Sequence, residues 1–310
     1  MQNDSYLNLN NGDKMPVIGL GTWKSSPAEV GSAVEYALLE CGYKHIDCAA
    51  IYGNEKEIGL AFKNVFSDKK NSRQEVFITS KLWNNAHAKD DVAIACKNTL
   101  RDLQLEYLDL YLMHWGVATS LDLGREPVDK TGKLITAKLP IRETWEAMEE
   151  LVKLGLVRSI GVANFTAPML VDLFTYAKIM PSVNQVELHP YNQQSRLVEF
   201  CQDHKMVVTA YSPLGSPGNN PGDQPVLLDD RVIKEIAQSH QKSPAQILIR
   251  WARQRETIAI PKTVTAERIK ENIAVFDFEL SSAEMDSVSA LERGYRYVDP
   301  WDWWRIPYFD

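Results

Sequence analysis

Short apolar runs alternate along the chain with longer segments in which apolar residues recur every three or four positions. The apolar runs predict buried strands, and the amphipathic segments predict helices that cover them. The predicted strands span 17–21, 44–48, 76–81, 108–114, 157–163, 183–187, 207–211 and 257–260. The predicted helices span 27–40, 55–66, 90–103, 141–154, 168–178, 195–204, 229–240, 244–254, 265–274 and 281–291. Strands that are nearly all followed by a helix favour a closed (β/α)8 TIM barrel over an open sheet.

An Asn11-Gly12 pair near the N-terminus separates two short apolar segments, 6–9 and 15–18. Asn-Gly suits the tight turn of a β-hairpin, so we expect a hairpin that closes the bottom of the barrel. The strand at 17–21 contains Gly19 and Gly21 but lacks the third glycine of the dinucleotide fingerprint. That absence argues against a doubly wound nucleotide-binding sheet.

Three segments interrupt the alternation, at 116–139, 212–225 and 292–310. Long loops in compact domains usually carry function. We therefore expect one barrel domain over 1–310, with these three segments lying over its active-site face. The last of them is an aromatic tail that holds Tyr295, Tyr297, Trp301, Trp303, Trp304, Tyr308 and Phe309.

Composition narrows the classes of partner. The net charge of −7 over 310 residues argues against nucleic acid or an anionic membrane surface. The sequence has no apolar run long enough to span a bilayer, and its first residues lack the pattern of a signal peptide. The four scattered cysteines predict a reducing, cytoplasmic location, and the six histidines form no metal-ligand spacing. We expect a monomer or dimer that binds a small molecule and no metal.

Chemically active residues stand where the second, third and fourth predicted strands end. Asp47, Lys81 and His114 occupy those ends, and Tyr52 follows Asp47 by five residues. A barrel gathers its strand ends around one opening, so Lys81 can pair with Asp47 and lie beside the Tyr52 hydroxyl. An adjacent cation would lower the pKa of the phenol from about 10 and make it a better proton donor.

This set of four side chains suits the protonation of a carbonyl oxygen during reduction. Because the set contains no metal or nucleophile, a nicotinamide is the simplest source of the hydride. Each residue alone has an ordinary structural explanation, such as an ion pair or a buried core side chain. The combination across three consecutive strands favours catalysis.

Longer motifs extend this interpretation. They are Gly19-Leu20-Gly21-Thr22-Trp23, Tyr43-Lys44-His45-Ile46-Asp47 with Tyr52-Gly53-Asn54-Glu55, Thr79-Ser80-Lys81-Leu82-Trp83, Asn184-Gln185-Val186-Glu187-Leu188-His189-Pro190-Tyr191, Tyr211-Ser212-Pro213-Leu214-Gly215 and Ile260-Pro261-Lys262-Thr263. On these motifs the chain resembles the aldo-keto reductases over roughly residues 6–310. The resemblance implies NADPH-dependent reduction of aldehydes and ketones on a (β/α)8 barrel. It also implies a catalytic tetrad of Asp47, Tyr52, Lys81 and His114, with Tyr52 as the acid.

The same resemblance implies a cofactor site. Tyr211 would stack on the nicotinamide, and Asn164 and Gln185 would bond its carboxamide. The main chain around Ser212, Leu214 and Ser216 would line the pyrophosphate. Lys262, Thr263 and Arg268 would grip the 2′-phosphate, which favours NADPH, with NADH as the weaker alternative. The implied site is completed by Glu271 and Asn272 at the adenine and by Gly21, Thr22, Trp23 and Val264.

The substrate is less constrained by the motifs. Trp23, Trp83, His114, Trp115 and Trp301 are expected in the pocket wall. Segments 52–57, 80–85 and 299–303 resemble fungal xylose reductases, whereas 154–161 and 177–181 resemble plant reductases of aldose 6-phosphates. These resemblances, and the wider one to aldose reductases, imply an open-chain aldose or aldose 6-phosphate that is reduced to the alditol. A phosphate would need cations such as Lys130, Lys133, Lys138 or Arg305.

Three positions depart from the family pattern. Ala163 replaces the usual Ser before Asn164, Gly116 replaces Pro after His-Trp, and Val298 replaces Asn before Asp-Pro-Trp. Gly116 predicts a more mobile loop, and Val298 removes a partner for a sugar hydroxyl. Two alternatives to a reductase stay open. One is a lyase barrel in which Lys81 or Lys262 forms a Schiff base, and the other is a non-catalytic module that binds NADP and senses redox state.

Overall fold

An eight-stranded parallel sheet forms the centre of the computed structural model, which describes residues 5–67, 71–219, 222 and 224–310. Its strand order is β10-β9-β8-β7-β6-β5-β4-β3, so strands that follow one another in sequence are neighbours in space. The strands are β3 (Leu20–Gly21), β4 (His45–Asp47), β5 (Phe77–Leu82), β6 (Leu108–Met113), β7 (Val157–Ala163), β8 (Val183–Glu187), β9 (Val207–Tyr211) and β10 (Ile258–Ala259).

The sheet closes into a barrel between its first and last strands. Parallel bridges join Ile18 to Ala259 and Gly21 to Lys262, across the gap between β3 and β10. The closure needs a glycine at 21, because an added Cβ would lie 2.8 Å from the carbonyl oxygen of Ile260. The predicted (β/α)8 barrel is therefore confirmed. β3 and β10 are shorter than predicted because they meet through single bridges.

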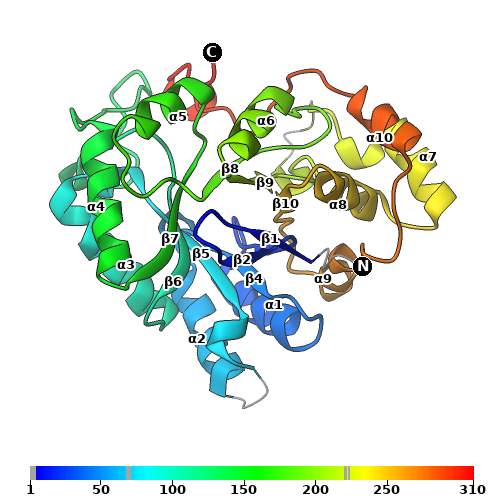
Figure 1. Ribbon diagram of the computed structural model, residues 1–310, viewed down its shortest axis with the longest axis horizontal. Helices are drawn as coiled ribbons and strands as arrows, with labels where there is room; N and C mark the ends of the chain where they lie inside the picture. The colour runs from blue at the N-terminus through cyan, green and yellow to red at the C-terminus, as the bar shows by residue number, and fades with distance from the viewer. Residues whose placement is uncertain (1–4, 68–70, 220–221, 223) are drawn as a thin grey trace.

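Helices surround the strands (Figure 1). They are α1 (Pro27–Leu39), α2 (Glu55–Ser67), α3 (Lys89–Leu103), α4 (Ile141–Lys153), α5 (Ala167–Phe174), α6 (Ser195–Asp203), α7 (Arg231–His240), α8 (Pro244–Gln254), α9 (Ala266–Ile273), α10 (Ser282–Ser289) and α11 (Trp301–Trp304). Most bounds lie within two residues of the prediction. α11 was not predicted, because four residues are too few to show a helical period.

The end of α5 differs most from its predicted end at residue 178. The helix stops at Phe174, and the chain then turns toward α4. The Glu149 carboxylate of α4 accepts hydrogen bonds from the main-chain N–H groups of Lys178 and Ile179, at 2.6 and 2.9 Å. These bonds hold the segment after α5 away from a helical path.

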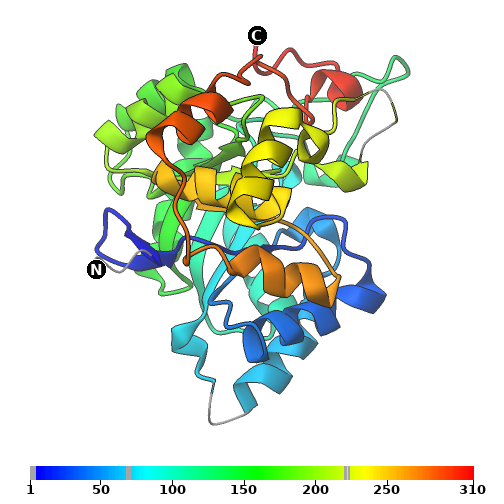
Figure 2. The ribbon, with the colours of Figure 1, turned by 90° about the vertical axis from the view of Figure 1, so that its right-hand side faces the viewer.

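The N-terminal hairpin pairs β1 (Tyr6–Asn8) with β2 (Lys14–Pro16) in antiparallel register. Leu9 and Met15 are buried in the cluster that fills the barrel interior. At its turn, Asn11 donates to Ser159 near the start of β7, at 2.9 Å. The hairpin therefore covers the amino-terminal end of the barrel, as predicted, and Figure 2 shows it well away from the C-terminal tail.

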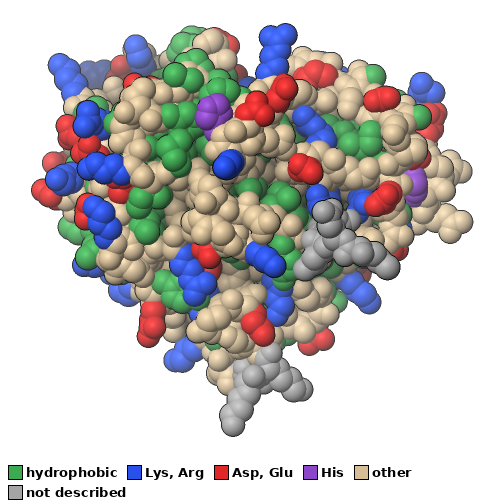
Figure 3. All heavy atoms as spheres, viewed as in Figure 1, with side chains coloured by type: hydrophobic (Ala, Val, Ile, Leu, Met, Phe, Trp, Pro, Cys, Tyr) green, Lys and Arg blue, Asp and Glu red, His purple; other side chains and the backbone are tan. Residues whose placement is uncertain are grey.

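Acidic and basic side chains are interspersed over the face of the molecule drawn in Figure 3. Among the described residues, no helix is long and apolar enough to cross a membrane. Of the four cysteines, all unpaired, Cys48, Cys96 and Cys201 are buried and Cys41 is partly buried.

Candidate active site

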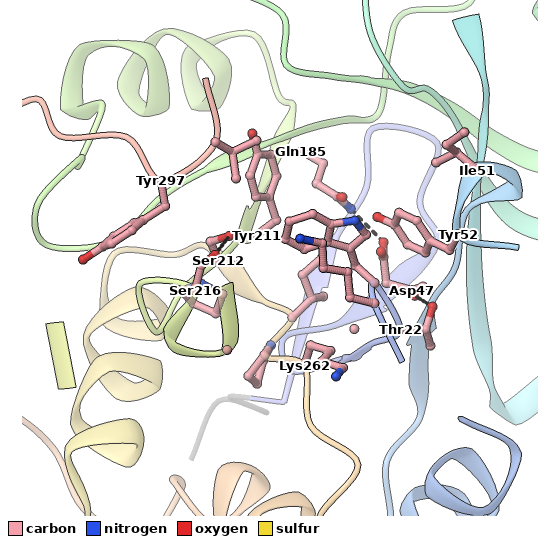
Figure 4. Close-up of a pocket in the computed structure, with 18 of the residues that line it drawn as sticks. Thr22, Asp47, Ile51, Tyr52, Gln185, Tyr211, Ser212, Ser216, Lys262 and Tyr297 are labelled. Carbon is pink, nitrogen blue, oxygen red and sulfur yellow. Dashed lines mark hydrogen bonds between the residues drawn. The ribbon is translucent and has the colours of Figure 1, made fainter. Parts of the chain in front are cut away.

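A cavity of about 870 Å³ opens at the carboxyl-terminal ends of the barrel strands. Its wall includes residues from the strand ends, from the three long segments and from the start of α9. In Figure 4, Asp47, Tyr52 and Gln185 gather at one side, and Ser212, Ser216 and Lys262 line another part. The strand-end side chains that the sequence singled out are therefore brought to one opening.

Asp47 and Lys81 are buried and form a contiguous group with Tyr52, which is partly buried. The Lys81 ammonium lies 2.5 Å from Asp47 Oδ1 and donates to the Cys48 carbonyl oxygen at 2.8 Å. It also reaches the Tyr52 hydroxyl at 3.4 Å. Tyr52 is held on a short 3-10 turn (Ala50–Tyr52) that ends at Gly53, whose φ of +69° lies in the left-handed region. His114 completes the group, with its ring 6.0 Å from the Tyr52 ring and nearly perpendicular to it.

Burial decides the charge states of these groups. Burial raises the pKa of Tyr52 to about 12, although the Lys81 charge opposes the rise. The prediction that Lys81 brings this pKa below its reference is therefore wrong. Desolvation outweighs the nearby cation. Tyr52 keeps its proton at neutral pH and has it available to donate.

Lys81 and His114 respond to burial differently. Burial alone would lower the pKa of Lys81, but Asp47 and Tyr52 outweigh it and raise that pKa. Lys81 is thus a protonated cation with no exposed surface. Burial lowers the pKa of His114 well below its usual value, and Lys81 adds to the effect. The imidazole is therefore neutral and can offer a hydrogen bond without carrying charge.

Two amide side chains and a phenol extend this group toward the cofactor side. Gln185 Nε2 donates to Asp47 Oδ2 at 2.7 Å. Asn164, in left-handed backbone at the end of β7, donates to the His114 carbonyl oxygen at 2.9 Å. The Tyr211 hydroxyl donates to Asn164 Oδ1 at 2.7 Å and so orients the phenol ring. All three side chains line the cavity, as predicted.

The other end of the cavity is suited to an anion. Lys262 and Arg268 line it, and within the described part of the chain neither forms an ion pair. Ser212 and Ser216 have left-handed backbone, and their hydroxyls are 2.7 Å apart. The cavity thus has a phenol that can stack on a nicotinamide ring, two amides that can bond its carboxamide, and two cations that can bind a phosphate. These groups fit a nicotinamide dinucleotide phosphate.

The predicted cofactor residues divide into two groups. Gly21, Thr22, Trp23, Leu214, Thr263 and Val264 line the cavity together with those named above. Glu271 and Asn272 lie on α9 outside the cavity wall, and Asn272 is buried. Their contact with an adenine stays a prediction.

Indole rings enclose the catalytic end. Trp83 and Trp115 are almost fully buried and pack against Trp304 of the tail, with ring centroids 6.0 and 5.3 Å apart. Trp83 Nε1 also donates to the Arg125 carbonyl oxygen at 2.7 Å, which ties the long loop to the wall. Among the described residues, no group of three or more His, Cys, Asp or Glu side chains could hold a metal ion.

A family model described as the aldo/keto reductase family matches residues 17–293. The chain belongs to this family. It is 50% identical to aldo-keto reductase family 1 member A1 of Xenopus tropicalis over 95% of this chain and 91% of the relative. The human protein of the same name is 49% identical, with 96% and 92% covered. The solved aldose reductase of Schistosoma japonicum superposes with a TM-score of 0.90 at 43% identity, covering 96% and 95%. This aldo-keto reductase is an NAD(P)H-dependent oxidoreductase.

The C-terminal tail of this reductase closes the cavity differently from the prediction. Trp301, expected in the wall, is 49% exposed and does not line the cavity. Trp303 and Trp304, on the single turn of α11, line it instead, and of these Trp304 is buried whereas Trp303 is 38% exposed. Tyr297 and Val298 also contribute to the wall. The aromatic content of the tail indicates that it covers the site, but no signal in the sequence distinguishes the residues that line the cavity from Trp301.

Gly116 has a role in this closure. Its main-chain N–H donates to the Tyr308 hydroxyl at 2.9 Å, and an added Cβ would lie 3.2 Å from that oxygen. An added Cβ would also lie 2.0 Å from Met169 Cε, so the glycine leaves room for this side chain as well as for the tail. The greater mobility that Gly116 predicts for the loop stays a prediction. Ile51, Lys24, Glu126 and Val128 are further wall residues that sequence reasoning missed.

Proposed function

We propose that this reductase uses NADPH to reduce an uncharged aldehyde to the alcohol, with Tyr52 as the proton donor. The observation that carries the proposal is the buried Asp47–Lys81 pair in contact with the Tyr52 hydroxyl, in an aromatic-walled cavity. Bound NADPH would supply a hydride to the carbonyl carbon. The side chains supply the proton and the positioning.

Tyr52 meets the requirements of the acid. Its raised pKa keeps the hydroxyl protonated, and the Lys81 cation stabilises the phenolate that remains after proton transfer. Asp47 keeps Lys81 charged and in place. His114 is neutral and next to Tyr52, so its ring can hold the carbonyl oxygen within reach of the hydroxyl.

NADPH is proposed over NADH because Lys262 and Arg268 line the cavity and form no ion pair with any residue that the structure describes. A 2′-phosphate would give both of them a partner, and NADH has none to offer. Tyr211 and Asn164 would present one face of the nicotinamide toward Tyr52.

The cavity favours an uncharged substrate over an aldose 6-phosphate. None of the cations suggested for a sugar phosphate, which are Lys130, Lys133, Lys138 and Arg305, lines the cavity. At the aldehyde end, indoles dominate the wall, and Lys24 lies over the Trp23 ring with its Nζ 4.6 Å from the ring centroid. Indole faces suit aromatic rings and the C–H faces of an open-chain aldose. We therefore propose aromatic aldehydes and neutral open-chain aldoses as the substrate class.

A spectrophotometric assay of NADPH oxidation tests this proposal. Benzaldehyde, xylose, glucose 6-phosphate and mannose 6-phosphate would each be run with NADPH and with NADH. We expect the highest kcat/KM with benzaldehyde and NADPH, followed by xylose. A preference for either 6-phosphate would contradict the proposed substrate class, and an absence of NADPH oxidation with every aldehyde would contradict the proposed reaction.

The lyase alternative requires a neutral, accessible lysine. Lys81 is fully buried and paired with Asp47, and its pKa is raised, so it is a poor nucleophile. Borohydride should therefore trap no adduct of Lys81 with an aldose. The NADP-sensing alternative requires binding without turnover, and the assay above separates it from the reductase.

A further inference from the structure

The buried carboxylate of Glu187 anchors the C-terminal tail to the barrel. Glu187 is the last residue of β8 and has no exposed surface. Its Oε1 accepts a hydrogen bond from the Tyr297 N–H at 2.6 Å, and its Oε2 accepts one from the Val298 N–H at 3.1 Å. Both tail residues line the cavity. The tail is therefore held to the strand end at the point where it enters the wall.

From this anchor, the Tyr297 side chain reaches the loop at 212–225. Its hydroxyl donates to the Pro225 carbonyl oxygen at 2.7 Å. The ring also packs against Gly215, where an added Cβ would lie 3.0 Å from the phenol oxygen. Tyr297 is 5% exposed, and burial raises its pKa, so the hydroxyl remains a donor at neutral pH. In Figure 4 its ring lies across the drawn residues from Tyr52, on the side of Ser212 and Ser216.

These contacts place one residue between the two halves of the cavity. The tail that carries Tyr297 also carries Trp304, which encloses the catalytic end. The loop that Tyr297 contacts carries Ser212, Leu214 and Ser216, which line the other end. Tyr297 therefore contacts both segments, so a displacement of either one would disturb its contacts.

We propose that Tyr297 couples the tail to the segment that carries Ser212, Leu214 and Ser216, so that ligand binding in the cofactor half and ligand binding in the aldehyde half reinforce each other. The assignment of the two halves rests on the proposed function. Such coupling is reciprocal, because each ligand must change the affinity for the other by the same factor. Tyr297 would thus be a positioning residue for both ligands, acting without contact to the reacting atoms.

The test measures the dissociation constant of NADP⁺ by tryptophan fluorescence, with and without saturating benzaldehyde. NADP⁺ and benzaldehyde do not react with each other, so the ternary complex is stable enough to titrate. In the wild-type protein, benzaldehyde should tighten NADP⁺ binding. In Tyr297→Phe, which keeps the ring, this enhancement should fall by about three- to tenfold, as expected for the loss of one buried hydrogen bond.

Tyr295→Phe is the matched control. Tyr295 is a tail tyrosine with its ring centroid 5.1 Å from that of Tyr297, and its hydroxyl makes no hydrogen bond to any described residue. It should keep the wild-type enhancement. A second variant, Glu187→Gln, replaces one acceptor oxygen at the anchor and should lose the enhancement even if Tyr297→Phe folds poorly.

Three results would overturn the coupling. They are an absence of enhancement in the wild type, an unchanged enhancement in both Tyr297→Phe and Glu187→Gln, or equal losses in Tyr297→Phe and Tyr295→Phe. Failure of the proposed function has a different signature, which is the absence of NADPH oxidation by the wild-type protein. Thermal midpoints of all variants separate a loss of coupling from a general loss of stability.

Discussion

Gln185 donates a 2.7 Å hydrogen bond to Oδ2 of Asp47, the carboxylate oxygen that is not bonded to Lys81. Asp47 is therefore held on both sides, by an ammonium and by an amide. The bond also orients Gln185, because with Nε2 bonded to Asp47, Oε1 remains as the acceptor for a carboxamide. The proposed catalytic group and the proposed nicotinamide site thus share a single carboxylate.

Tyr52→Phe should lower kcat by at least about a hundredfold, because it removes the hydroxyl that is proposed to donate the proton to the carbonyl oxygen. The affinity for NADPH should stay within about a factor of two, since the hydroxyl is at the aldehyde end. Stopped-flow turnover and fluorescence titration measure the two quantities. A variant with near wild-type kcat would refute the proposed role of Tyr52.

Lys81→Met should reduce turnover and also destabilise the fold. It leaves the Asp47 carboxylate buried without its cation, which costs on the order of 3–5 kcal/mol. Urea denaturation measures the free energy of unfolding. The double variant Asp47→Asn/Lys81→Met should regain much of the stability but none of the activity. If the single and double variants were equally stable, the unpaired Asp47 charge would not be the cause of the destabilisation.

The Glu55 carboxyl predicts how the stability of the fold depends on pH. Burial raises its folded-state pKa from 4.5 to about 7, despite hydrogen bonds from Ser80 and Thr99. The folded state therefore holds this proton more tightly than the unfolded chain. The resulting stability is fully present below pH 4.5 and is lost as the pH rises through about 7.

Glu55→Gln should remove this dependence. The variant should match the wild type near pH 4.5 and exceed it by about 3 kcal/mol at pH 8, from 1.36 kcal/mol per unit of pKa. Denaturation curves across this range provide the measurement. A difference between variant and wild type that stays constant with pH would exclude Glu55 as the titrating group.

Lys262→Met should weaken NADPH binding by about ten- to a hundredfold and leave NADH binding nearly unchanged, since only NADPH carries the 2′-phosphate. Lys270→Met is the control, because Lys270 is an exposed cation of α9 outside the cavity wall. Fluorescence titration with both cofactors checks the prediction. Equal losses for NADPH and NADH would place Lys262 elsewhere on the cofactor.

Trp304→Phe should raise the KM for benzaldehyde several-fold, because the smaller ring loosens the wall formed with Trp83 and Trp115. Trp301→Phe should leave this KM unchanged, since Trp301 is half-exposed and outside the wall. Steady-state kinetics of the two variants make the comparison. A larger change in KM from Trp301→Phe than from Trp304→Phe would support the prediction from the sequence that Trp301 lies in the pocket wall.

Much of the architecture could be predicted because its causes are local. A strand covered on both faces must be apolar, so its end is visible where Asp47, Lys81 or His114 interrupts the run. The bounds of β7, β8 and β9 also match the prediction. A barrel then requires those ends to meet, and the members of the catalytic group could be named before any coordinates.

The charge states and the tail depended on packing between distant segments. The pKa of Tyr52 rises because its surroundings in the fold desolvate the hydroxyl, and no local pattern in the sequence predicts that desolvation. The choice of Trp304 over Trp301, and the contact of Tyr297 with Pro225, follow from one short turn and one buried carboxylate. The sequence by itself determined the barrel and the residues available at its opening. Only the tertiary structure decided their protonation and which aromatic rings close the site, because desolvation and ring packing depend on what the rest of the chain places around each group.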